Sequence, residues 1–350
     1  MRRKITLVIF ALLAVTLMWE SAYAQQDHLL NLQAEVRVDY QYEGVDGEKV
    51  VDNTGFKGKY LNLILNGKIS KKITYSYRQR LNKSHSSQSF FDATDWIYLI
   101  YSPCKHWDLS AGKQVVSIGG FEYDRAPIDL YTCSEFWNNI PCYQFGVSAS
   151  YLMNSGRNKF HFQVCESPFR SVCNDDVYAY NFMWYGIHDW FNTAWSVNMI
   201  EYEKGKFINY IALGNYLRFG NLHFYLDFMN RATSHQTFLF KDCSFMGEVS
   251  YNVGEKFKLF GKVTYDVNKT DNIADFCVLP GTELTLYGGG VEYFPLKGNN
   301  NLRLHATYFY STGTNGNPYG TMQDKGSVID VGLKWKMNIL KLERRKNNDA

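Results

Sequence analysis

The sequence predicts an all-β fold: a transmembrane, antiparallel β-barrel of about sixteen strands whose long third loop folds into the lumen. Three observations lead to this prediction. Polar and apolar side chains alternate along many segments that are longer than ordinary globular strands. Short connections alternate with long ones. The chain is also rich in aromatic residues, with 26 Tyr and 24 Phe, which favour strands and form the girdles of membrane barrels.

The N-terminal segment has the pattern of an export signal. A basic stretch at Arg2 to Lys4 precedes an apolar run from Ile5 to Met18 and a small-x-small site from Ala22 to Ala24. We therefore expect residues 1–24 to be a cleaved signal peptide and residues 25–350 to form one barrel domain. The alternative, a signal anchor, is disfavoured because the apolar run is shorter than the roughly 20 residues of a spanning helix.

Charge and cysteine content exclude several classes. The chain has 37 Lys and Arg against 34 Asp and Glu, so it lacks the strongly basic balance typical of nucleic-acid binding. Its seven cysteines include two pairs close enough in sequence to form disulfides in an oxidising compartment, Cys133 with Cys142 and Cys165 with Cys173. The alternative is that they remain free thiols. No Cys spacing is typical of zinc, and we expect neither a metal nor a cofactor.

The first strand shows the alternation most clearly. From Leu30 to Tyr42, apolar residues occupy every second position and polar residues the positions between them, so one face is apolar and the other polar. The pattern recurs fifteen times. The further predicted strands are Lys59–Ile69, Ile73–Leu81, Asp95–Tyr101, Trp107–Val116, Tyr143–Leu152, Lys159–Cys165, Tyr178–Tyr185, Phe191–Tyr202, Phe207–Arg218, Leu222–Met229, Phe245–Tyr251, Phe257–Asp266, Glu283–Tyr293, Leu302–Tyr310 and Val328–Met337.

The connections between these segments indicate which ends of the strands lie together. Short turns alternate with longer loops almost throughout, as in outer-membrane barrels. A secreted β-sandwich, the alternative all-β fold, has no reason to gather its long loops at one end. The predicted long loops are 43–58, 82–94, 117–142, 166–177, 230–244, 267–282 and 311–327.

The longest segment without clear alternation is the loop 117–142. It carries four acids, Glu122, Asp124, Asp129 and Glu135, against one base, Arg125. Its many aromatic residues argue against disorder. We therefore expect this loop to fold into the lumen and to narrow a pore.

One short motif resembles a known family. Gly112-Lys113-Gln114 is followed by Ile118-Gly119-Gly120-Phe121-Glu122-Tyr123, similar to the entry into the third loop of the phosphate-selective porin O and P family. The resemblance implies a sixteen-stranded, trimeric barrel that passes small anions, with Lys113 beside the constriction. The chain departs from the pattern at its end, where Trp335 is followed by the charged tail 342–346.

The alternation also predicts which charged side chains face the lumen, because a base on the lipid face would cost about 2–4 kcal/mol at mid-membrane. We expect a basic wall opposite the acidic loop and a transverse field between them, which favours small polar or zwitterionic solutes and mildly prefers anions. The alternative is that Arg78 and Arg80 pair with acids on neighbouring strands. The predicted basic wall consists of Arg37, Arg78, Arg80, Lys258, Lys262, Arg303, Lys334 and Lys336.

These features predict a passive outer-membrane diffusion channel of a Gram-negative bacterium, surrounded by lipid and forming a homotrimer. Its solutes would be small polar or anionic molecules, phosphate among them, although the loop carboxylates argue against strict phosphate selectivity. A closed barrel with an adhesin or structural role is the alternative. No enzyme motif is found: Gly-x-Ser-x-Gly is absent, and His161 fits a lumen hydrogen-bonding role better than that of a catalytic base.

Overall fold

The computed structural model describes residues 28–83, 90–234, 236 and 240–343. The predicted signal peptide, residues 1–24, lies outside the described residues. Among those described, no helix has the length and apolar character to cross a membrane.

Sixteen long strands and one short strand make up the described sheet, and each predicted strand corresponds to one of the long ones. The structure extends most of them by one to several residues. The short strand is β2 (Glu48–Lys49), and the long ones are β1 (His28–Val45), β3 (Gly55–Lys68), β4 (Ile73–Arg80), β5 (Thr94–Cys104), β6 (Trp107–Val115), β7 (Tyr143–Leu152), β8 (Asn158–Glu166), β9 (Tyr178–Gly186), β10 (Phe191–Glu203), β11 (Lys206–Phe219), β12 (Leu222–Thr233), β13 (Asp242–Val253), β14 (Phe257–Asn268), β15 (Glu283–Tyr293), β16 (Leu302–Thr314) and β17 (Gly326–Glu343).

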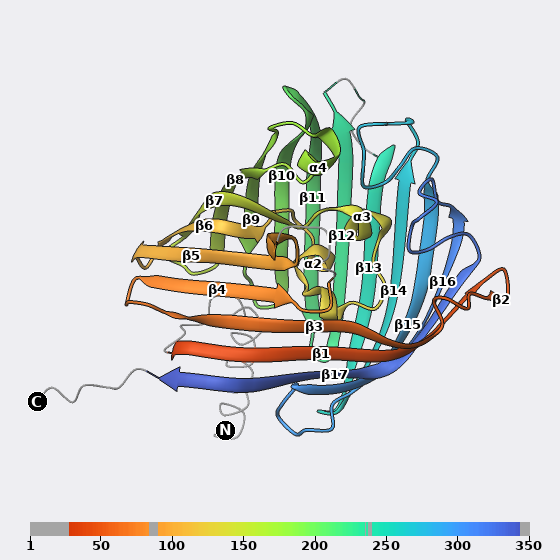
Figure 1. The fold of residues 1–350 in the computed structure, drawn as a ribbon, viewed down its shortest axis with the longest axis horizontal. Helices are drawn as coiled ribbons and strands as arrows, with labels where there is room; N and C mark the ends of the chain where they lie inside the picture. The colour runs from red at the N-terminus through yellow and green to blue at the C-terminus, as the bar shows by residue number, and fades with distance from the viewer. Residues whose placement is uncertain (1–27, 84–89, 235, 237–239, 344–350) are drawn as a thin grey trace, which may run out of the picture.

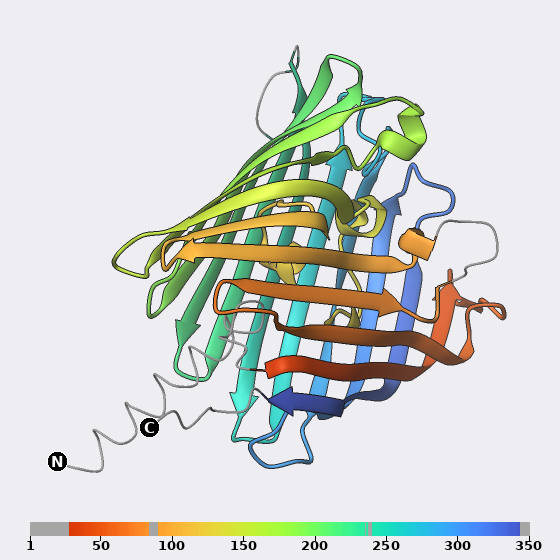
Figure 2. The same ribbon diagram turned by 60° about the vertical axis from the view of Figure 1, so that its left-hand side comes forward.

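The sheet closes on itself through its first and last long strands. β1 pairs antiparallel with β3 on one side and with β17 on the other, and Arg37 lies opposite Tyr60 and Lys334 in these two registers. Every other long strand pairs with its sequence neighbours. In Figure 1, β1, β3 and β4 lie in front of the lumen and β11 to β13 behind it, and Figure 2 shows the same wall from the side. The predicted closed, antiparallel barrel is confirmed.

The alternation along each strand separates an outer apolar face from an inner polar face. On β17, Val331 and Trp335 are 51% and 48% exposed, whereas Asp330, next to Val331, is 1% exposed. On β14, Leu259 points outward and Lys262 inward in the same way. Because successive strand residues point to opposite faces, the sequence period of two determines this assignment.

One part of the inner wall departs from the polar pattern. Ala194 on β10 and Ile208, Tyr210 and Ala212 on β11 face inward and are at most 1% exposed. The three β11 residues form an apolar cluster with residues of the loop 117–142, including Phe136. The inner face of β11 is therefore apolar at this level, because it is covered by protein rather than by water.

Of the two alternatives considered for the cysteines, the structure has the free thiols. All seven lie within the described residues and are free thiols. Cys165 and Cys277 are buried in the apolar cluster around the loop, where a thiol packs as a small apolar side chain. The disulfides considered for Cys133–Cys142 and Cys165–Cys173 are therefore not present.

Candidate functional site

The loop 117–142 lies inside the barrel, as predicted. It contains three short helical turns, α2 (Phe121–Asp124), η2 (Pro127–Asp129) and α3 (Glu135–Asn139). Figure 1 shows α2 and α3 within the wall, in front of β12 and β13. The lumen at this level is the candidate functional site.

Small residues allow the start of the loop to lie directly against the wall. The Gly119 N–H donates to Ser196 Oγ at 2.8 Å, and the Gly120 N–H donates to the Ala194 carbonyl at 3.0 Å. A Cβ atom on Gly214 of β11 would lie 2.7 Å from Gly120 Cα. Gly120 itself has φ of 113°, a conformation that favours glycine. Glycine on both sides thus permits this close approach.

Two carboxylates of the wall bind the first turns of the loop helices. Asp227 accepts a hydrogen bond from the Glu122 N–H at 2.7 Å. Asp266 accepts from the N–H groups of Glu135 and Phe136 at 2.8 and 3.3 Å. The first N–H groups of a helix lack intrahelical partners, so these wall carboxylates satisfy them and fix the orientation of both turns.

Ion pairs join the charges of the loop to opposite charges of the wall. Lys262 Nζ lies 2.5 Å from Glu122 Oε1, and both side chains are less than 10% exposed. Asp129 Oδ1 is 2.6 Å from Lys334 Nζ and 2.9 Å from Arg303 Nη1. These members of the predicted basic wall therefore touch the acidic loop, whereas the transverse-field hypothesis placed the two sets of charges across a gap.

The remaining loop base is held in the same manner. Arg125 Nη1 donates to both carboxylate oxygens of Glu248, at 2.8 and 3.0 Å. Its guanidinium also lies over the ring of Tyr225, 4.4 Å from the centroid. Here the loop supplies the base and the wall supplies the acid, the reverse of the Glu122 and Asp129 pairs. Ion pairs of both arrangements therefore hold the loop against the wall.

On the other side of the lumen, bases pair within the wall. Arg78 lies 2.8 Å from Asp95 on the neighbouring strand, and Arg80 lies 3.1 Å from the same carboxylate. This is the alternative arrangement considered for Arg78 and Arg80. Arg37 pairs with Asp39 at 2.7 Å and also donates to the Leu130 carbonyl of the loop.

The other predicted site residues are more dispersed. Lys258 pairs with Glu292 at 3.3 Å and Lys336 with Glu35 at 3.5 Å. Three other predicted residues form no ion pair within the described part of the chain: Lys113 donates to the Phe91 carbonyl at 2.5 Å, Glu135 accepts from Asn139 at 2.7 Å, and Asp124 is exposed.

Sequence reasoning missed most carboxylates of the far wall. Asp227, Glu248, Asp266 and Glu292 all hold loop groups or lumen bases. Of these, only Asp266 lies in the same predicted strand as the predicted lumen bases Lys258 and Lys262, on their face of the alternation. Applying the period of two to β12, β13 and β15 would have placed the other three inward. The alternation does not indicate which group of the loop each carboxylate contacts.

Base and acid differ in exposure within several lumen pairs. In each of five pairs the base retains a side-chain exposure of 23–35%, while its acid is at most 9% exposed. Asp129 shows the opposite difference, because it is 34% exposed and its partner Arg303 is 8% exposed. The five pairs, base first, are Lys59–Asp330, Arg80–Asp95, Arg125–Glu248, Lys258–Glu292 and Lys336–Glu35. The charge that these pairs present to lumen water is therefore mainly positive.

The loop carboxyls differ in their pKa values. Burial tends to raise the pKa of Asp129, but the charges of Lys334 and Arg303 outweigh it and lower the pKa to about 2. Enclosure by the barrel raises the pKa of Asp124, and Lys159 opposes this only in part. Because its pKa is depressed, Asp129 contributes stability that is present above pH 3.8 and is lost as the pH falls through about 2.

We expect the anion preference of the lumen to rise as the pH falls from 7 toward 4. Asp124 then becomes protonated, because its pKa is raised, while Asp129 stays ionised and paired. Reversal potentials measured in a salt gradient at several pH values test this. An Asp124→Asn variant is the control and should show a higher preference at pH 7 and a smaller rise over the same range. A preference that falls with acidification would contradict the assignment.

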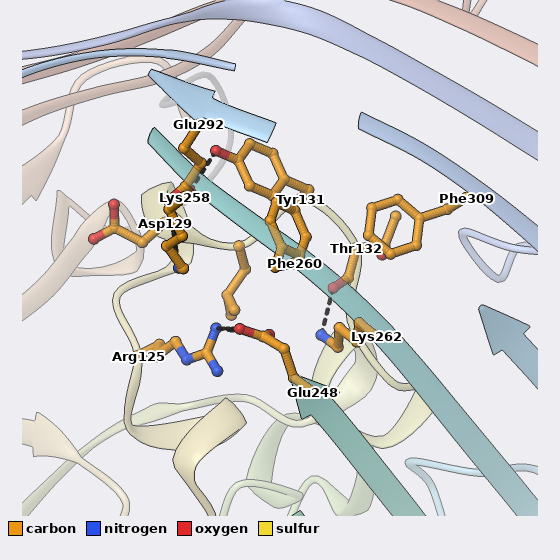
Figure 3. Close-up of a pocket in the computed structure, with 11 residues that line it drawn as sticks. Arg125, Asp129, Tyr131, Thr132, Glu248, Lys258, Phe260, Lys262, Glu292 and Phe309 are labelled. Carbon is orange, nitrogen blue, oxygen red and sulfur yellow. Dashed lines mark hydrogen bonds and ion pairs between the residues drawn. The ribbon is translucent and has the colours of Figure 1, made fainter. Parts of the chain in front are cut away.

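A small cavity of about 20 Å³, enough for about one water molecule, lies between the loop and the wall formed by β13 to β16. Figure 3 shows Arg125 and Glu248 on one side of it and the rings of Tyr131, Phe260 and Phe309 on another. Tyr131 stacks on Phe260 with ring centroids 5.5 Å apart. Among the described residues, no group of three or more His, Cys, Asp or Glu side chains is placed to hold a metal ion.

Comparison with known proteins agrees with this architecture. The family model described as phosphate-selective porin O and P matches residues 30–188, which include the loop 117–142. No curated protein matches the sequence.

Three solved structures illustrate the structural similarity. The anion-selective porin from Comamonas acidovorans has a TM-score of 0.62 at 12% identity, covering 88% of this chain and 99% of that one. The trimer form of OmpT from Vibrio cholerae has a TM-score of 0.60 at 12% identity, covering 88% of this chain and 99% of that one. The outer-membrane channel DcaP from Acinetobacter baumannii has a TM-score of 0.60 at 13% identity, covering 88% of this chain and 97% of that one. The chain therefore shares the barrel fold of these outer-membrane proteins, and its residues 30–188 match the phosphate-selective porin O and P family.

Proposed function

We propose that this protein is a passive diffusion channel for small polar or anionic solutes, with an eyelet formed by the loop 117–142. The observation that supports it best is the attachment of the loop to opposite parts of the wall. Gly120 and Glu122 fix it to β10, β12 and β14, while Leu130 and Asp129 reach β1, β16 and β17. A loop attached to opposite parts of the wall is held across the lumen and narrows it.

The exposed charges support a mild preference for anions. The bases of the five lumen pairs face water, whereas their acids lie behind them. Asp124 and Asp129 also face water, so a multiply charged anion meets negative charge at the loop. This argues for general passage of small polar and anionic solutes, phosphate included, rather than strict phosphate selectivity.

The proposed setting is the outer membrane of a Gram-negative bacterium, reached by export with a signal peptide at residues 1–24. The band of exposed apolar side chains on the outer face of the strands suits contact with lipid. A homotrimer is proposed because the similar OmpT structure is described as a trimer form. The family match over residues 30–188 and the barrel fold support a channel rather than an enzyme.

The proposal is tested by inserting the folded chain 25–350 into planar bilayers. We expect discrete conductance steps and a reversal potential that shows a modest preference for chloride over potassium in a KCl gradient. Folding is checked independently by heat-modifiable gel mobility. A cation preference would contradict the assignment of the exposed bases.

Lys258→Gln is expected to lower the anion preference by no more than about fivefold, because an exposed charge contributes at most about 1 kcal/mol. Lys258 is one of the exposed lumen bases, with 26% of its side chain in contact with water. Lys49→Gln, in the exposed strand β2, removes the same charge outside the lumen and is the matched control. Equal effects of the two changes on the reversal potential would argue against a lumen origin of selectivity.

A closed barrel with an adhesin or structural role is the second candidate. The observation in its favour is the dense packing at the level of the loop, where Arg37 and Arg78 are each only 2% exposed. Heat-modifiable protein that inserts into bilayers without any conductance steps would support the closed barrel over the channel.

A further inference from the structure

The short turns of the barrel differ in charge from one sector to the other. They all lie at the end of the barrel where β1 begins and β17 ends. Three of them, 69–72, 105–106 and 294–301, carry four lysines and no acid. The other four, 153–157, 187–190, 220–221 and 254–256, carry two bases and two acids. The four lysines are Lys71, Lys72, Lys105 and Lys297, and the charges of the other turns are Arg157, Lys256, Asp189 and Glu255.

The three lysine-bearing turns belong to one continuous sector of the wall. Strands β15, β16 and β17 pair in order, β17 pairs with β1, and β1 pairs with β3, which leads on through β4 and β5 to β6. Figure 1 shows the turns β3–β4 and β5–β6 and the ends of β1 and β17 together at the left. Two lysines at strand ends complete the set. The basic rim is defined as Lys68, Lys71, Lys72, Lys105, Lys297 and Lys341.

The charge of the basic rim is not neutralised by the protein. Within the described residues only Lys341 has an ion pair, to Glu343 at 3.1 Å, and its side chain remains 45% exposed. The four turn lysines are exposed. Asp108, the nearest acid of β6, is on the inner face and accepts a hydrogen bond from Ser102 Oγ at 2.5 Å. The rim therefore presents net positive charge to its surroundings.

The rim lies directly beside the apolar outer face of the strands. Each of its turns and its strand end is within two residues of an outward, exposed apolar side chain. Outer-membrane barrels place such residues, aromatic ones above all, against lipid at the membrane–water interface. The lysines are therefore at the level of the lipid headgroups. The apolar residues are Ile69, Trp107, Leu296 and Leu342, which are 52%, 44%, 44% and 44% exposed.

We propose that the basic rim binds the phosphate headgroups of anionic phospholipids in the leaflet around the short-turn end. Clusters of four or more bases next to a membrane attract anionic headgroups, and the neighbouring apolar side chains contact the acyl chains. A zwitterionic headgroup carries an ammonium group of its own, which is repelled by the lysines. The inference rests on the proposed membrane location and adds a lipid class to the partners; it does not depend on conduction.

The test uses a fluorophore attached to Cys104, the exposed thiol among the seven free cysteines, next to Lys105. The folded chain 25–350 is placed in phosphatidylcholine vesicles that contain a small fraction of spin-labelled phosphatidylglycerol or spin-labelled phosphatidylcholine. We expect the anionic quencher to be enriched about fivefold or more around the label, the effect of at least one base near the headgroups. High salt should reduce this enrichment. Equal quenching by the two lipids at low salt would overturn the proposal.

A combined Lys71→Gln, Lys72→Gln, Lys105→Gln variant is expected to lower the enrichment at least threefold. The matched control removes three exposed lysines at the opposite end of the barrel and should leave the enrichment unchanged. Changing the same three rim lysines to Arg keeps the charge and should retain it. Equal losses in the rim and control variants, or loss in the Arg variant, would contradict the rim. The control substitutions are Lys49→Gln, Lys204→Gln and Lys241→Gln.

Heat-modifiable gel mobility verifies that each variant is folded, and conductance is recorded separately. Conductance steps with equal quenching by both lipids would refute the rim and leave the channel intact. Enrichment of phosphatidylglycerol without conductance would refute the channel and retain the rim. Equal quenching together with rim-dependent retention on insoluble peptidoglycan would assign the lysines to that anionic polymer and overturn the lipid inference.

Discussion

A Lys262→Met variant is expected to lose about 3–5 kcal/mol of folding free energy, as measured for buried ion pairs that lose one partner, and to conduct more current than the wild type. Lys262 is the cation that neutralises Glu122, and both side chains are almost fully buried. Its ammonium group also donates to the Thr132 carbonyl at 2.7 Å. Without it, an uncompensated carboxylate remains between the loop and the wall, so the loop should leave its position and widen the lumen.

The measurements for Lys262→Met are the temperature of the gel-mobility transition and the single-channel conductance. Lys258→Met is the matched control, because Lys258 is an inward-facing lysine of the same strand whose side chain stays 26% exposed. Adding Glu122→Gln to Lys262→Met should recover part of the stability, since the buried carboxylate is then removed as well. Equal loss in the two single variants, or no recovery in the double variant, would contradict the assigned role.

A Gly214→Ala substitution is expected to destabilise the barrel by roughly 1–3 kcal/mol, in the range of overpacked cores, and to change the conductance. The added Cβ would lie 2.7 Å from Gly120 Cα and 3.0 Å from the Ala194 carbonyl. Neither is the end of a flexible side chain, so the start of the loop must move away from β11. Gly120, with φ of 113°, has little freedom to adjust without losing its own hydrogen bond to Ala194.

Gly261→Ala provides the matched control for Gly214→Ala. Gly261 lies mid-strand in β14, and a Cβ there would meet no atom nearer than 3.7 Å. Both variants remove the same flexibility from a strand glycine, so only the contact with the loop differs. If both variants shift the gel-mobility transition equally and neither changes the conductance, the proposed role of the contact between Gly214 and the loop is incorrect.

The sequence alone predicted all sixteen long strands and the inward path of the loop 117–142. The period of two is a local property, so it is sufficient to place Lys262 and Leu259 on opposite faces of β14. The boundaries were less well predicted: β17 continues to Glu343 and β13 begins at Asp242. Polar and apolar residues still alternate at both ends, in Asp242-Cys243-Ser244 and from Leu340 to Glu343, so the predicted strands stopped short of a pattern that the sequence contains.

The pairing within the site could not be predicted in the same way. Asp129 meets Lys334, 205 positions away in the chain, and this contact depends on where the loop crosses the lumen. The spacing of Cys133 and Cys142 left a disulfide open, yet both thiols are free. Short spacing in sequence was therefore a poor guide to pairing in this loop.

The sequence by itself determined that this chain forms a barrel, which face of each strand meets lipid, and that a charged, aromatic loop turns inward. These follow from local alternation and from the cost of exposing charge to lipid. The tertiary structure alone decided that most lumen bases are paired, that the acids lie behind the bases, and that a charge-balanced cavity forms beside Tyr131. The reason is that strand stagger and the path of one loop set which distant side chains meet, and neither quantity is encoded in any short stretch of sequence.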